Sequence, residues 1–66
     1  MNLDEIYLAD TFNELLDILD NMEQNEQVIR ARNLTSHAFI HTENEEEELS
    51  NIKEQVIEIL EKESDL

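Results

Sequence analysis

The chain has 66 residues and a formal net charge of −14, from 18 Asp and Glu against 4 Lys and Arg. One domain of this length hides only about 60% of the surface that its unfolded form exposes, so we expect self-association or a partner to add stability. The charge excludes sequence-independent nucleic-acid binding over most of the surface, because such binding needs Lys and Arg to neutralise phosphates. The negative charge favours a basic partner. The alternative is that the acidic residues serve only to keep a small protein soluble.

Gly, Pro and Cys are all missing from the sequence. Without Cys there is no disulfide or thiolate metal site, which is compatible with a reducing cytoplasm. The lack of Gly and Pro favours helices joined by short polar links. No apolar run approaches the ~20 residues that cross a bilayer, and no signal peptide is evident, so we expect a cytoplasmic protein with no membrane association.

The first predicted helix covers about 3–22. Its apolar residues recur at spacings of four, three, four and three, as in an amphipathic helix: Leu8, Phe12, Leu15, Leu19 and Met22. Two capping boxes could start it, Asn2 with Glu5 or Thr11 with Glu14. We favour the earlier start and a continuous helix.

The second predicted helix covers about 25–41 and follows a polar turn in which an Asn adopts the left-handed conformation. Its inward positions recur at helical spacing: Val28, Ala31, Thr35, Ala38 and Phe39. A short strand at 38–40 is the alternative, because β-branched and aromatic residues gather there.

The third predicted helix covers about 44–63, with Thr42 and Glu45 as its capping box. Glu45 to Glu48 would lie at the positive end of the helix dipole, which gives this acidic run a structural explanation. Its apolar seam is Leu49, Ile52, Val56, Ile57, Ile59 and Leu60. The sequence therefore predicts an all-α fold, a single small helical domain over 1–66 with three helices, which assembles into a dimeric up-and-down helical bundle.

The string R-N-L-T-S-H at 32–37 is the part of the chain that indicates chemistry. Arg32 supplies a fixed charge suited to phosphate, His37 exchanges protons near neutral pH, and Asn33 can orient either, as phosphodiester chemistry or nucleotide binding requires. On a helix Arg32 and His37 lie about 140° apart, so they would meet more easily across two chains. The alternative is that Arg32 forms a salt bridge in an acidic chain and His37 is a surface residue.

His37 and His41 are four residues apart and could share a metal ion. No third ligand follows from the sequence, and no His-Glu-x-x-His or Cys pair is present. We therefore predict no metal and no cofactor.

The string at 32–37 resembles the R-N-x-T-S-H motif of the HEPN superfamily, and especially that of nucleotidyltransferase substrate-binding proteins. The likeness covers roughly 28–63 and includes the aromatic residue Phe39 and an amphipathic last helix. It implies a helical bundle that forms a homodimer through the motif helix, brings two Arg-His pairs together, and pairs with a minimal nucleotidyltransferase in a toxin–antitoxin-type system. Carried over by position, Arg32 would hold a phosphate, His37 would be the acid or base, and Asn33 would orient them.

The chain departs from the family in two respects. Phe39 stands where related toxins carry the tyrosine that their partner modifies, so that modification is excluded at this position. Family members are usually longer, so the chain would be a shortened member that completes its bundle by dimerising, or a remnant without the activity.

The resemblance implies a nucleotide- or RNA-associated binding subunit of a nucleotidyltransferase pair. Two alternatives stay open. One is a metal-independent endoribonuclease with Arg32 and His37 as catalytic residues, in which Arg30, Arg32 and their dimer mates make a local positive cleft. The other is an acidic mimic of nucleic acid that inhibits a basic protein.

Overall fold

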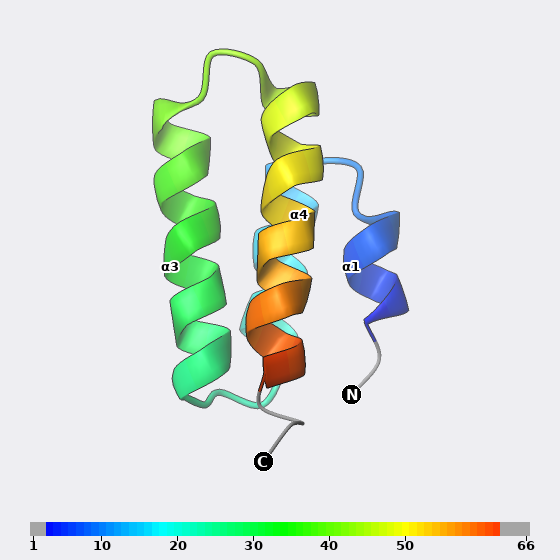
Figure 1. The fold of residues 1–66 in the computed structure, drawn as a ribbon, viewed down its shortest axis with the longest axis vertical. Helices are drawn as coiled ribbons and strands as arrows, with labels where there is room; N and C mark the ends of the chain where they lie inside the picture. Colours follow the sequence, from blue (N-terminus) through cyan, green and yellow to red (C-terminus); the bar gives the residue numbers. More distant parts are fainter. Residues whose placement is uncertain (1–2, 63–66) are drawn as a thin grey trace.

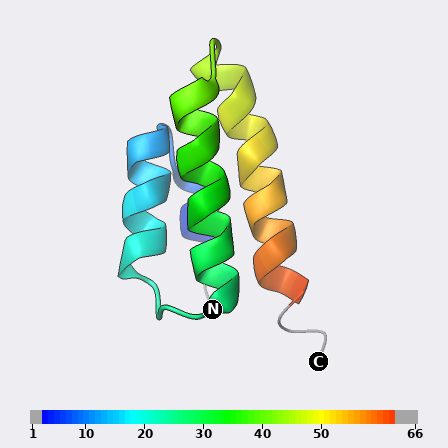
Figure 2. The same cartoon turned by 90° about the vertical axis from the view of Figure 1, so that its left-hand side faces the viewer.

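The computed structural model describes residues 3–62, which form four helices: α1 (Asp4–Leu8), α2 (Phe12–Asn21), α3 (Glu26–His41) and α4 (Glu45–Lys62). Successive helices run in opposite directions along a bundle of 36 × 20 × 19 Å (Figure 1). Helix α3 packs against both α2 and α4, and α1 packs against the same two helices (Figures 1 and 2). The predicted all-α class is confirmed, and α3 continues through 38–40, where a strand was the alternative.

The predicted continuous helix over 3–22 is wrong, and so is the count of three helices. The chain leaves the helix at Ala9 and re-enters it after Thr11, whose backbone is extended (φ −140°, ψ 161°). The Thr11 hydroxyl oxygen accepts from the backbone N–H of Glu14 at 3.1 Å, and the Glu14 carboxylate accepts from the N–H of Asp10 at 3.1 Å. The Thr11 cap, with Glu14 reaching back to the residue before it, starts a new helix. Asn2, of the other candidate pair, lies outside the described residues.

The core lies between the helices, and all four helices contribute residues to it. The buried apolar residues are Ile6, Ala9, Phe12, Leu15, Leu19, Val28, Ala31, Leu49, Ile52, Val56, Ile57 and Leu60. The predicted inward stripes of the last two helices are therefore confirmed in outline, with Ala38, Phe39 and Ile59 partly buried. Leu8 was expected in the core, but it is 74% exposed, because the break at Ala9 removes it from the register that begins at Phe12.

Thr35 is the one buried polar residue among those described. Its hydroxyl donates to the carbonyl of Ala31, one turn earlier, at 2.8 Å. A buried hydroxyl with no partner would cost about 1–3 kcal/mol, so this bond is what makes Thr35 tolerable in the core.

The turn between α2 and α3 differs from the prediction of a left-handed Asn, since no described residue has a positive φ. Met22 is extended, and the side-chain amide of Gln24 donates to the carbonyls of Leu19 (3.0 Å) and Met22 (2.9 Å). Asn25 then caps α3, its side-chain oxygen accepting from the N–H groups of residues 27 and 28. The side-chain amides of Gln24 and Asn25 therefore form the hydrogen bonds that end α2 and start α3, without a residue in the left-handed conformation.

The cap of α4 also lies later than predicted. Asn44 Oδ1 accepts from the N–H of Glu47 at 3.3 Å, and the Asn44 side-chain amide donates to the Glu47 carboxylate at 3.4 Å. Thr42 instead accepts from the N–H of Asn44 at 3.2 Å. The start of α4 agrees with the prediction, but the residue whose side chain caps the helix is Asn44 and not Thr42. None of the helices within 3–62 has the length and apolar character needed to cross a membrane.

Candidate functional site

All the residues singled out for chemistry lie on α3. This helix carries Arg30, Arg32, His37 and His41 but a single carboxylate, Glu26. By contrast, α2 carries three acidic residues and α4 carries seven. The charge of the chain is therefore unevenly distributed, and α3 is the helix where an anion or a second copy of this acidic chain would be repelled least.

Arg32 lies on the side of α3 that faces α2. Its Nε donates to the carboxylate of Asp20, near the end of α2. The two side chains are 44% and 50% exposed, and this is the ion pair found between described residues. Within one chain, Arg32 therefore has the salt bridge that the sequence left open, and a phosphate would have to compete with Asp20.

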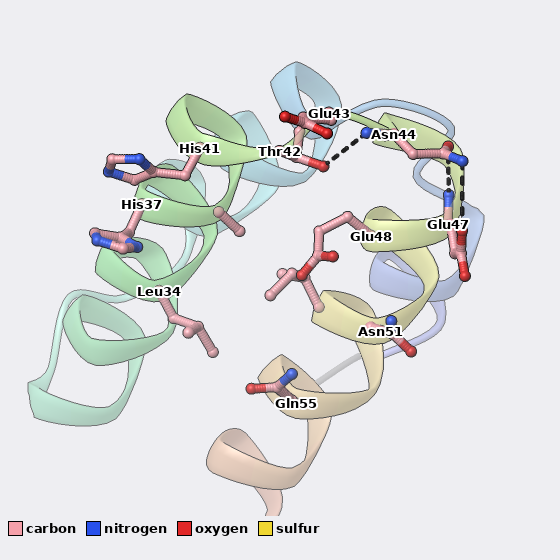
Figure 3. Close-up of a pocket in the computed structure, with 12 residues that line it drawn as sticks. Leu34, His37, His41, Thr42, Glu43, Asn44, Glu47, Glu48, Asn51 and Gln55 are labelled. Atoms are coloured by element: carbon pink, nitrogen blue, oxygen red, sulfur yellow. Dashed lines mark hydrogen bonds between the residues drawn. The ribbon is translucent and has the colours of Figure 1, made fainter.

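His37 lies on a different side of α3 from Arg32, and its ring is turned away from α4 (Figure 3). Its ring contacts that of His41, with centroids 4.4 Å apart and planes at 42°. Both histidines and Asn33 are exposed. One chain alone thus does not bring Arg32 and His37 to one pocket, as their separation of about 140° around the helix requires. A shared pocket would need a second copy.

A groove separates the last half of α3 from the first half of α4 (Figure 3). It has a volume of about 570 Å³, and its apolar floor consists of Leu34 and Ala38 from α3 and Ile52 from α4. We call it the α3–α4 groove. It lies at the end of the bundle next to the linker at 42–44.

The two rims of the α3–α4 groove carry different polar side chains, imidazoles on the α3 side and carboxylates on the α4 side. His37 and His41 form the α3 rim, with their rings turned outward, whereas Glu43, Glu47 and Glu48 line the linker and the α4 rim. Figure 3 shows the Glu48 side chain reaching toward α3. These carboxylates oppose the approach of a nucleotide phosphate to His37 from this side.

Sequence reasoning missed the groove and its acidic rim. Glu48, Ile52 and Gln55 recur at spacings of four and three, which is a helical stripe beside the apolar seam of α4. That spacing could have indicated a half-polar face, but its position opposite His37 depends on how α3 and α4 pack. Among residues 3–62 the two histidines are not joined by a third His, Asp or Glu into a group that could hold a metal.

Comparison of the chain with protein-family models, with curated proteins and with solved structures gives no match. The features described above define a small acidic protein whose residues 3–62 form four helices, with an uneven charge and a groove beside its histidine pair.

Proposed function

We propose that the chain is a HEPN-like, nucleotide- or RNA-associated binding subunit that pairs with a minimal nucleotidyltransferase in a toxin–antitoxin-type system. The observation that carries the proposal is the charge contrast between α3 and the other helices. The resemblance at 32–37 suggests that the partner is a nucleotidyltransferase. The separation of Arg32 from His37 around α3 supports binding, rather than catalysis, by a single chain.

The acidic exterior supports a basic partner. Every described Asp and Glu is exposed except Glu48, which is half-buried. Such a surface accelerates encounters with a positively charged protein, and the effect weakens as salt screens the charges.

The outer face of α3 supports association with a second copy. Ile29 is 49% exposed and Ile40 is 73% exposed, with Asn33 and Ser36 between them at helical spacing. Two chains of charge −14 repel least when these faces meet, because the other helices present mainly carboxylates. We therefore include in the proposal a homodimer that pairs through the outer face of α3.

The test is to sequence the gene beside this one and, where it encodes a minimal nucleotidyltransferase, to coexpress that protein with this chain. We expect the two proteins to elute together at low salt and to separate as salt rises. An unrelated acidic helical protein of similar charge, coexpressed in its place, should elute alone. A neighbouring gene of another kind, or separate elution at low salt, would contradict the proposal.

The acidic mimic of nucleic acid is the second candidate, favoured by the exposed carboxylates. Its binding to a basic protein should fall steeply with salt and should be unchanged by Arg32→Ala. Loss of binding in that variant would exclude it. The geometry of one chain does not support the endoribonuclease, since Arg32 pairs with Asp20 on α2 whereas the His37 ring is turned outward on another side of α3. Cleavage of RNA in EDTA that His37→Ala abolishes would restore this alternative.

A further inference from the structure

The α3–α4 groove combines features that point to a protein segment as its occupant. Its floor, made by Leu34, Ala38 and Ile52, lies between two helices and is open to solvent. Its volume of about 570 Å³ falls within the roughly 300–1,000 Å³ typical of sites that enclose a ligand. Apolar side chains of an occupant would be removed from water there.

The charges on the rim of the groove determine which charge the occupant must carry. Glu43, Glu47 and Glu48 line the groove, and no Lys or Arg does. None of the three is in an ion pair with a described residue, and the Glu47 carboxylate accepts only the neutral amide of Asn44. The start of α4 stabilises Glu47 and Glu48 through the helix dipole, but Glu43 precedes the helix and has no such support. A phosphate is excluded by repulsion, whereas Arg or Lys would find partners.

The backbone restricts how a segment could bind. Residues 3–62 contain no strand, so the groove offers no sheet edge to which an extended peptide could add. Affinity must come from side chains that recur on one face, which is the mode by which an amphipathic helix binds a groove between helices.

We propose that the α3–α4 groove binds a basic amphipathic helix of the partner protein. An aliphatic side chain of that helix lies between Leu34 and Ile52, and Arg or Lys side chains beside it pair with Glu43, Glu47 and Glu48. The inference rests on the proposed function in one respect, that the chain acts by binding a protein, and it locates that binding at the end of the bundle nearest 42–44.

The experiment titrates the full chain with a synthetic helix of about 14 residues, or roughly four turns, with leucines on one face and arginines on the other. Amide shifts in ¹⁵N spectra locate the contact. We expect the largest shifts at 34–38 and 47–52, and a dissociation constant weakened about tenfold or more in Glu47→Gln/Glu48→Gln.

Matched variants separate groove binding from general attraction to an acidic surface. Glu54→Gln/Glu58→Gln removes the same charge from the exposed side of α4, and binding should change less than about twofold. Asn51→Lys places a cation on the groove rim and should weaken binding, whereas Ser50→Lys, one residue away, should do so less. Equal effects of the two glutamine pairs, or shifts spread over all helices, would overturn the inference.

Failure of the groove inference can be distinguished from failure of the proposed function. If the nucleotidyltransferase binds the chain and the Glu47→Gln/Glu48→Gln variant binds it equally well, the function stands and the groove inference is wrong. If the peptide occupies the groove but no nucleotidyltransferase coelutes, the groove binds a basic helix from another class of protein.

Discussion

Arg32 on α3 donates a hydrogen bond to the carboxylate of Asp20 on α2, twelve residues earlier in the chain. The residue that the resemblance assigns to a phosphate is therefore already paired with a carboxylate of its own chain. Both groups are about half exposed, so the pair is weak enough to be exchanged for another anion.

Replacing Asp20 tests whether Arg32 can hold a phosphate. Asp20→Asn should strengthen binding of ATP, measured by calorimetry, because it leaves the guanidinium without its partner. Asp17→Asn makes the same change of charge on the same helix and should have a smaller effect. Equal effects would show that general charge, and not release of Arg32, is responsible. The free energy of unfolding should change by less than about 1 kcal/mol in either variant.

Leu15 tests the position of the core. It is fully buried in α2, so Leu15→Ala should lower the free energy of unfolding by about 2–5 kcal/mol in urea titrations. Leu8→Ala makes the same change at a residue that is 74% exposed, and should alter stability by no more than about 0.5 kcal/mol. Similar losses in both variants would contradict the break between α1 and α2.

Thr11 tests the start of α2. Thr11→Ala removes the acceptor for the Glu14 N–H and should cost about 0.5–2 kcal/mol, measured by thermal or urea unfolding. Asn13→Ala, within the first turn and exposed, should be neutral or slightly stabilising because Ala is the better helix former. If the two variants were equally stable, Thr11 would not be the cap.

Phe12 and Phe39 connect α2 to α3, with ring centroids 5.4 Å apart and planes at 23°. A double-mutant cycle with leucine at each position should give a coupling energy of about 0.5–1.5 kcal/mol. A coupling near zero would mean that the rings contribute only through burial. Phe39 thus has a packing role between α2 and α3.

The apolar spacing in the sequence was sufficient to predict α3 and α4 and their approximate bounds. The residues that cap these two helices, Asn25 and Asn44, were not predicted as caps. The sequence was insufficient for the break at Ala9, because Leu8 continues the helical spacing of the apolar residues and favoured the earlier of the two candidate capping boxes. Local patterns cannot choose between them, since the choice depends on burying Ile6 and Ala9 against the rest of the bundle.

The candidate site was predictable only in part. The spacing of His37 and His41 and their placement on one side of α3 follow from the helical period. The pairing of Arg32 with Asp20, and the position of Glu48 across from α3, depend on how separate helices pack. No spacing in the sequence encodes those contacts.

The most direct test of the account is the mass of the chain in solution, measured by sedimentation equilibrium. If the outer face of α3 binds a second copy, the wild type should sediment at twice 7.8 kDa, Ile40→Asp should sediment as a monomer, and Leu8→Asp, equally exposed on α1, should remain a dimer. A monomeric wild type, or a dimer that Ile40→Asp leaves intact, would contradict the claim that this face of α3 is an interface.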